Sequence, residues 1–200
     1  MARKRQFSGD PQRPGPRSSA GGKQSSAAAA AQGCSLGVRR VPGENAWELV
    51  HPPCAEERAD DLSEVEQMLD SGEAEIAREE LRWLLEGCRD LLAAHRLLGE
   101  IALEEGDAKL ARAHFGYAFQ LGVDALAQSG DPGPLPYQRP ANQGFFQAGK
   151  GLAWSFQQLG QPEKAREIAE RLLALDPADP LNFRANLAGI HSTPLDPPGG

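Results

Sequence analysis

The sequence predicts an all-α fold built from stacked helix pairs, and two observations carry this prediction. The phrase Gly-acid-Ala-x-x-Ala occurs at Gly72–Ala77 and again 34 positions later, at Gly106–Ala111. The 16 prolines and 22 glycines gather near the N-terminus, in a central insert and near the C-terminus. Because proline and glycine disfavour helix interiors, the packed core is expected to lie between these three segments.

A repeat of about 34 residues indicates helix-turn-helix units that bury their apolar faces only by stacking on one another. The copies can be followed through the small and aromatic positions of each unit. The middle copy has His95, Leu98, Gly99, Ala102, Ala111 and Phe115; the third has Gly149, Leu152, Ala153, Phe156, Ala165, Ala169 and Pro177; the weaker first has Asp61, Glu64, Val65, Met68, Ala77, Leu81 and Arg89.

Over about two-thirds of its length the chain resembles the tetratricopeptide repeat (TPR) family, whose pattern these positions follow. The resemblance implies a short right-handed superhelical stack of about three TPR-like helix pairs plus a C-terminal capping helix. An ordinary helical bundle with alanine-rich interfaces is the alternative, since it also produces apolar residues with a helical period.

The N-terminal region divides into two predicted segments. Residues 1–40 hold eight basic side chains and one acid, a net charge of +7, and are expected to form a disordered basic tail. Residues 41–55, with Trp47, Leu49 and a double proline, are expected to lie extended against the first helix as a cover for the stack. A peptide motif for another protein is the alternative for this second segment.

The helical domain is predicted to span residues 56–191, with units at about 58–90, 92–123 and 146–179, a cap at 180–191 and a flexible tail at 192–200. A Pro-rich insert at about 124–142 separates the second unit from the third. A loop of that length is usually functional or disordered. It is expected to be an ordered strap packed on its own repeats or, alternatively, a flexible or partner-binding loop.

Several classes of protein receive no support from the sequence. The three cysteines, Cys34, Cys54 and Cys88, are odd in number and share no C-x-x-C spacing, which predicts neither a disulfide framework nor a metal site and favours a reducing interior. No apolar stretch reaches the length of a membrane span, so a cytoplasmic location without membrane association is expected. Because no catalytic or phosphate-binding motif occurs, the chain is expected to be no enzyme and to need no cofactor.

The resemblance implies that the first helix of each pair lines a concave groove. In that frame Arg96, Lys150 and Arg184 take the same position in successive units and would form a column of cations suited to an acidic protein or peptide partner. Trp154 takes one of the other groove-facing positions. Alternatively, Arg96 pairs with Glu100 one helical turn away and belongs to a solvated face.

The predicted function is therefore a non-enzymatic adaptor that binds a protein or peptide in the groove of a short TPR array. The alternative is an accessory protein of RNA or ribosomes that uses the basic N-terminal arm, since residues 41–200 carry a net charge of −14 and leave the arm as the cationic part. Nucleic acid is the less favoured partner because Phe7 is the arm's one aromatic residue for base stacking.

Overall fold

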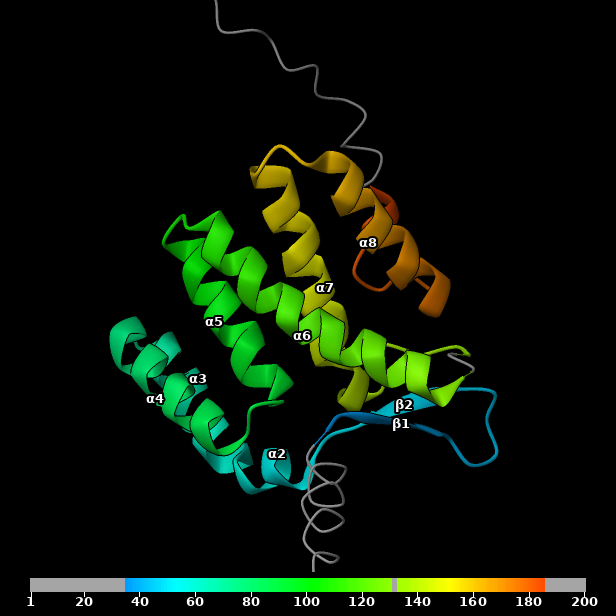
Figure 1. Cartoon of the computed structure of the whole chain (residues 1–200), viewed down its shortest axis with the longest axis horizontal. Helices are drawn as coiled ribbons and strands as arrows, with labels where there is room; N and C mark the ends of the chain where they lie inside the picture. Colours follow the sequence, from blue (N-terminus) through cyan, green and yellow to red (C-terminus); the bar gives the residue numbers. More distant parts are fainter. Residues whose placement is uncertain (1–34, 131–132, 186–200) are drawn as a thin grey trace, which may run out of the picture.

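Helix-turn-helix pairs make up most of the part of the chain that this computed structural model describes, residues 35–130 and 133–185 (Figure 1). A short helix, α2 (Pro53–Glu57), leads into the first pair. The pairs are α3 (Ala59–Asp70) with α4 (Ala74–Gly87), α5 (Leu92–Glu104) with α6 (Ala108–Ser129), and α7 (Pro140–Gln158) with α8 (Pro162–Leu175). Each helix contacts the next one in the chain, and α5 also contacts α7. The predicted predominance of helix is confirmed.

The three pairs turn in the same way. Gly72, Gly106 and Gly160 adopt φ values of 81°, 76° and 67°, a left-handed conformation that favours glycine. In each turn the N–H after the glycine donates to the carbonyl five residues earlier, over 2.9, 2.8 and 2.9 Å, so the last carbonyls of the first helix are satisfied. The repeated sequence phrase therefore marks a repeated turn geometry.

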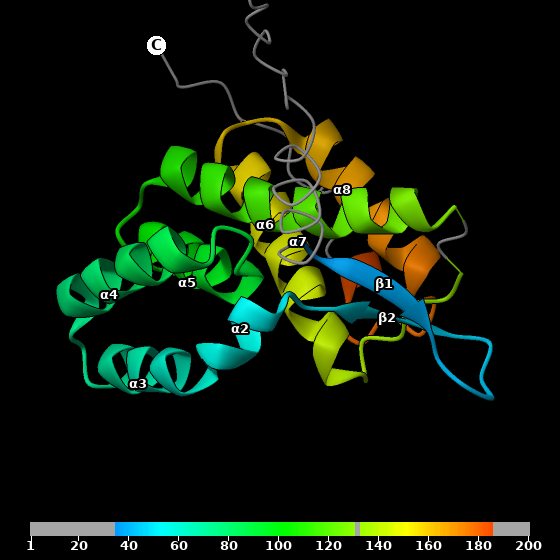
Figure 2. The ribbon, with the colours of Figure 1, turned by 60° about the horizontal axis from the view of Figure 1, so that its bottom comes forward.

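A β-hairpin precedes the helices, so the all-α prediction is wrong for this segment. β1 (Gly37–Arg40) pairs antiparallel with β2 (Trp47–Val50), with Val38 opposite Leu49. The predicted boundary at residue 40 divides the hairpin, because β1 lies inside the expected basic tail. The hairpin contacts α6 and α7 instead of the first helix (Figure 2). Leu49 is buried in the same apolar cluster as these helices, which explains the position of the hairpin.

The Pro-rich insert is shorter than predicted. Helix α6 continues to Ser129, because Ala125 and Leu126 extend its buried face, and α7 begins at Pro140. Residues 133–139 form a strap packed on the protein: the N–H of Leu135 donates to the Leu175 carbonyl over 2.9 Å, and the Leu135 side chain is fully buried. Of the two alternatives for the insert, these residues adopt the ordered one.

Asn142 joins the hairpin, the strap and α7. Its side chain is fully buried. The Oδ1 atom accepts a hydrogen bond from the N–H of Leu49 over 2.9 Å, and Nδ2 donates to the carbonyls of Trp47 and Pro136 over 3.2 and 2.8 Å. Because a buried amide is stable only when its polar atoms are paired, this residue fixes the three segments relative to one another.

The apolar core has two clusters. The larger joins the hairpin, the strap and helices α5–α8, and includes five buried phenylalanines: Phe115, Phe119, Phe145 and Phe146 on α6 and α7, and Phe183 after α8. The ring of Phe115 packs so closely on α5 and α7 that a Cβ at Gly99 or Gly151 would lie 2.8 or 2.5 Å from it. The smaller cluster joins α3, α4 and α5 around aliphatic residues such as Leu81 and Leu84. Helix α5 belongs to both clusters.

The predicted C-terminal cap falls partly outside the described residues. Phe183 to Ala185 are helical, and the Phe183 side chain is buried in the larger cluster. Residues 186–191 of the predicted cap, the tail at 192–200, and residues 1–34 of the basic arm lie outside the described residues.

Candidate functional site

A groove of about 720 Å³ lies between α5, α7, α8 and the segment that follows α8. Helix α7 supplies most of its surface, and Tyr137 of the strap closes one wall. Its lining comprises Glu100, Leu103, Phe115, Tyr137, Gln147, Lys150, Gly151, Ala153, Trp154, Gln157, Ala165, Ala169, Leu181, Asn182 and Phe183. A groove of this size accommodates a few side chains of a bound peptide.

Helix α7 is amphipathic, and its polar face lines the groove. Its opposite face buries Phe145 and Phe146 in the larger cluster. Lys150, Trp154 and Gln157 follow one another at intervals of four and three residues, so they share a face. The Trp154 side chain is 53% exposed, although tryptophan ordinarily buries most of its surface. An exposed indole beside an ammonium group is therefore the main surface feature of the groove.

Small residues make the groove deep. Ala165 and Ala169 of α8 face it, and both are buried. At Gly151 the ring of Phe115 leaves no room for a side chain. The Gly151 backbone therefore lies directly against Phe115, and Ala165 and Ala169 add no side chain longer than a methyl group to the wall.

Two aspartates after α8 hold two walls of the groove in place. Asp176 accepts hydrogen bonds from the N–H groups of Tyr137 and Ala178 over 2.8 and 3.1 Å. Asp179 accepts from the N–H groups of Phe183 and Arg184 over 2.6 and 3.0 Å, which caps the helical turn that begins at Phe183. The Asp-Pro-Ala-Asp sequence thus positions both the strap and the segment 181–183.

Two of the four predicted site residues, Lys150 and Trp154, line the groove. Among the described residues, Lys150 takes part in no ion pair. Lys150 is also the one lysine or arginine in the described lining of the groove. Its ammonium group therefore carries the positive charge of this lining, and no described carboxylate forms an ion pair with it.

The other two predicted residues, Arg96 and Arg184, do not extend the cationic column. Arg96 forms ion pairs with Glu66 of α3 at 3.3 Å and with Glu100 at 2.7 Å, which is the alternative that helical spacing suggested. Arg184 lies 3.6 Å from Asp179 and donates to the Pro177 carbonyl over 3.0 Å. Because carboxylates neutralise both guanidinium groups, the predicted column reduces to Lys150.

Among the groove residues that the sequence did not predict as site residues are Tyr137, Asn182 and Phe183. Tyr137 lies in the Pro-rich insert, where its alternation with prolines was a signal of contact with a surface. Phe183 and Asn182 follow the second Asp-Pro of the turn after α8, and that turn brings them back over the groove. These residues reach the groove through tertiary folding, so their positions in the groove could not be predicted from spacing within one repeat.

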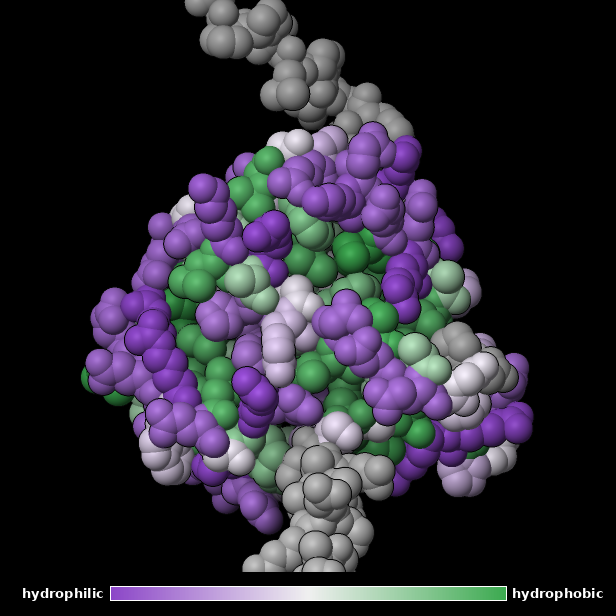
Figure 3. All heavy atoms as spheres, viewed as in Figure 1, coloured by the Kyte–Doolittle hydropathy of each residue, from purple (hydrophilic) through white to green (hydrophobic). Residues whose placement is uncertain are grey.

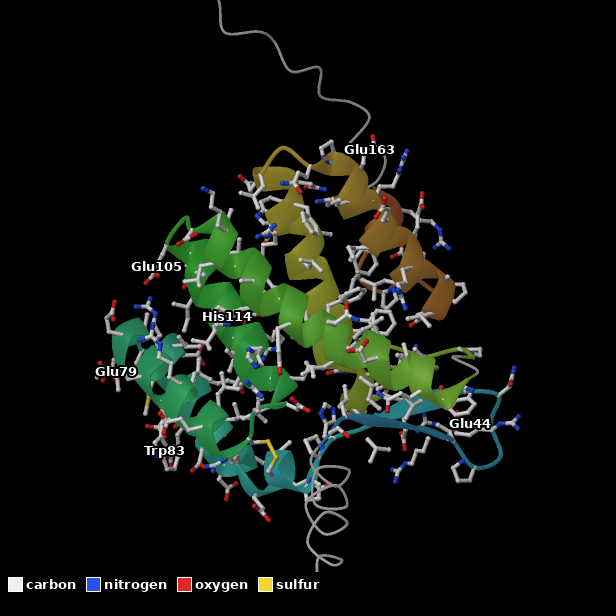
Figure 4. All side chains as sticks on the ribbon, in the orientation of Figure 1. Glu44, Glu79, Trp83, Glu105, His114 and Glu163 are labelled. Atoms are coloured by element: carbon white, nitrogen blue, oxygen red, sulfur yellow. A yellow bond between two sulfur atoms is a disulfide. The ribbon has the colours of Figure 1, made fainter. Side chains whose placement is uncertain are left out.

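A second cluster of titratable groups lies between α5 and α6. The rings of His95 and Tyr117 lie 4.3 Å apart, and the rings of His95 and His114 lie 5.9 Å apart. Nε2 of His95 donates to the Arg89 carbonyl over 3.1 Å, while Nδ1 is buried without a hydrogen-bond partner among the described residues. Figure 4 shows His114 on α6. On the face of the molecule seen in this view, hydrophobic and hydrophilic residues are interspersed (Figure 3).

Burial shifts both imidazoles toward their neutral forms. It lowers the pKa of His95 below the ordinary 6.5, against the weaker opposing effects of the Arg89 carbonyl and Asp90. Burial also lowers the pKa of His114, and the nearby His95 and Arg82 add to the shift. Protonation of either ring would place charge in a poorly solvated position. Protonation of the cluster is therefore expected to weaken the contact between α5 and α6.

Cys54 and Cys88 form a disulfide with a Cα–Cα distance of 5.6 Å, so the prediction of no disulfide is wrong. The two cysteines are separated by 34 residues. This separation equals the repeat period, so the two cysteines occupy equivalent places shortly before the first helices of successive pairs. The odd number of cysteines did not indicate this pairing, but their spacing could have done so. The argument from cysteine usage for a reducing location no longer holds.

Within residues 35–130 and 133–185, no group of three or more His, Cys, Asp or Glu side chains is arranged to hold a metal ion. The helices of this part of the chain are too short or too polar to cross a membrane. Comparison with known proteins found no family model that matches the chain and no similar curated protein.

Proposed function

We propose that this chain is a non-enzymatic adaptor of the TPR type that binds a peptide segment of another protein in the groove along α7. The observation that carries the proposal is the half-exposed Trp154 beside the unpaired Lys150 on the wall of this groove. Three helix pairs that share one turn geometry, at Gly72, Gly106 and Gly160, support the TPR part of the proposal.

The chemistry of the groove favours recognition of a peptide. Trp154 and Tyr137 offer large apolar surfaces, and aromatic residues of this kind contribute much of the energy of protein interfaces. Lys150 supplies a charged donor for a carboxylate or a backbone carbonyl. The groove therefore suits a peptide that combines an apolar side chain with an acidic one.

The groove offers less for catalysis. Its described lining contains one carboxylate, Glu100, which Arg96 holds at 2.7 Å. The lining contains no histidine or cysteine among the described residues. A general base near a nucleophile is the usual requirement for hydrolytic chemistry, so binding explains this surface better.

The test uses two tryptophans with matched exposure. A displayed library of linear 12-residue peptides is selected on the full-length protein, and the enriched peptides are measured by fluorescence polarisation. Trp154→Ala is expected to weaken binding about tenfold or more, as loss of an aromatic interface residue does. Trp83→Ala, also 53% exposed but located on α4 away from the groove, should leave binding unchanged.

Two results would contradict the proposal. If Trp154→Ala leaves the affinity of all enriched peptides unchanged, the groove is not the binding site. If both substitutions weaken binding equally, the peptides recognise exposed tryptophan in general. Circular dichroism of the two variants controls for loss of structure.

The basic arm supports a second candidate function, binding to RNA, through the charge difference between residues 1–40 and the rest of the chain. The truncation that tests it should remove residues 1–34 only, because β1 begins at Gly37 and belongs to the folded part. Binding to a labelled single-stranded RNA should fall after truncation and at higher salt if the arm makes phosphate contacts. Unchanged binding would remove the arm from consideration.

A further inference from the structure

The Cys54–Cys88 disulfide encloses the first helix pair. It joins α2 to the residue that follows α4, so the loop it closes contains the whole of α3 and α4. The sulfur–sulfur bond lies at the base of this pair (Figure 4). Closing such a loop limits the conformations of the unfolded pair and thereby stabilises its folded form.

The first pair has few other connections to the protein. Neither α3 nor α4 contributes a side chain to the larger apolar cluster, and the smaller cluster reaches the rest of the protein through α5. Two ion pairs support this contact, Arg78 of α4 with Glu105 and Arg96 of α5 with Glu66 at 3.3 Å. Exposed ion pairs contribute little, so the buried apolar contact with α5 and the disulfide between the two ends of the pair are its main constraints.

The two sulfurs are unequally accessible. Cys88 is buried, with 1% of its surface exposed, whereas Cys54 is only partly buried. A thiolate from solvent therefore reaches Cys54 first, and Cys88 is the leaving group.

Arg58 places a positive charge beside Gly87, which precedes the leaving group in the sequence, and also lies 3.7 Å from Asp61. The guanidinium of Arg58 fills the space beside Gly87, the residue before Cys88, where it excludes any Cβ. It also lies over the ring of Trp83, 5.0 Å from the ring centroid. A neighbouring cation favours a thiolate over a thiol, and a stabilised leaving thiolate departs faster.

We propose that Cys54–Cys88 is a redox-modification site at which a dithiol reductant opens the covalent loop around α3 and α4 and so loosens the first helix pair. One thiolate of the reductant attacks Sγ of Cys54, and the electron pair of the broken sulfur–sulfur bond leaves on Cys88. The second thiol of the reductant then attacks the mixed disulfide. The reductant ends as a disulfide and the protein as two thiols, after transfer of two electrons and two protons. This reaction goes beyond the peptide-binding proposal and does not depend on it.

Hydrogen exchange measured by mass spectrometry tests this loosening, with dithiothreitol as the reductant and the full-length protein. After reduction, amides in residues 59–87 should exchange faster by a factor on the order of a hundred, the scale of the loop-closure effect. Amides in residues 140–175 should keep their rates. The double variant Cys54→Ser, Cys88→Ser should reproduce the reduced pattern without reductant.

Two outcomes would overturn the proposal. Unchanged exchange in residues 59–87 would show that the disulfide does not restrain the pair. An equal increase across α5–α8 would show that the bond stabilises the whole protein and not one part. Measurements on the reduced wild-type protein keep the test decisive even if the double variant fails to fold.

Arg58 has its own test as a positioning residue. In a redox titration against dithiothreitol, Arg58→Leu should shift the thiol–disulfide equilibrium toward the disulfide by about threefold or more, because the thiolate loses its neighbouring cation. Arg112→Leu, an exposed arginine on α6, serves as the control. An unchanged equilibrium in Arg58→Leu would rule out this role for the guanidinium.

Discussion

The first helix pair and the two later pairs share a turn geometry but differ in what holds them together. α3 and α4 pack around aliphatic side chains in the smaller cluster and are closed by a disulfide. The pairs α5–α6 and α7–α8 surround four phenylalanines, and the hairpin and the strap cover them. The larger side chains bury more apolar surface, which is the main source of folding free energy.

This difference shows how one helical repeat can be stabilised by unlike means within one chain. The later pairs gain from segments outside the repeat, since Asn142 ties the hairpin and the strap to α7. The first pair has no such covering segment among the described residues and instead has a covalent bond between its two ends. The cross-link restrains the pair itself, while the smaller cluster attaches the pair to α5.

The largest expected effect comes from truncating one core residue in each region. Phe115→Ala removes a fully buried ring that contacts both Gly99 and Gly151, and should lower the free energy of unfolding by about 4 kcal/mol. Leu81→Ala in the smaller cluster should cost about 3 kcal/mol. Urea denaturation monitored by circular dichroism measures both losses.

The regional difference predicts where each loss is felt. Phe115→Ala should accelerate hydrogen exchange throughout α5–α8, whereas Leu81→Ala should do so mainly in residues 59–104. If both variants accelerate exchange uniformly over the described residues, the two clusters form one cooperative unit and the comparison fails.

The sequence predicted the helices well because its signals there are local. The glycines at positions 72, 106 and 160 adopt positive φ, and in each pair the first helix ends and the second begins close to one of these turns. Lys150 and Trp154 also emerged from the repeat frame, since positions within one helix keep their relative directions whatever surrounds them.

Features that depend on distant contacts escaped prediction. The strand at Gly37–Arg40 carries two arginines, so its composition predicted part of the basic tail. In the structure it pairs with Trp47–Val50 and packs on helices far along the chain. Arg96 seemed free for a ligand, but Glu66 from the preceding pair meets it at 3.3 Å. Such partners are determined by tertiary packing, which no local pattern encodes.

The contact between α5 and α6 should respond to pH through the histidine cluster. Burial lowers the pKa of His95 and His114 below 6.5, with Arg82 of α4, Arg89, Asp90 and Tyr117 around them. The unfolded chain therefore binds more protons than the folded one as pH falls below about 6.5, and stability decreases. The decrease should stay below about 1.4 kcal/mol per pH unit for each ring, the limit for one proton.

Unfolding in urea at pH 7.5, 6.5 and 5.5 measures this dependence. The double variant His95→Gln, His114→Gln lacks both titrating rings and should show a shallower loss between pH 6.5 and 5.5. The carboxylates are the same in both proteins, so the difference between the two profiles isolates the imidazoles. Identical profiles would show that these rings titrate alike in the folded and unfolded chain.

The smallest expected effect concerns the ion pair between Arg78 of α4 and Glu105 at the end of α5. Arg78 also meets Glu75 at 2.9 Å, and these partners raise the pKa of its guanidinium although burial opposes them. Since both carboxylates are exposed, Arg78→Met should lower the free energy of unfolding by less than about 1 kcal/mol and keep the apolar stem. The effect should grow after reduction of the disulfide, because the first pair then has fewer constraints and the ion pair contributes a larger share of them. An equal effect in oxidised and reduced protein, measured by hydrogen exchange in residues 74–87, would show that the two links act independently.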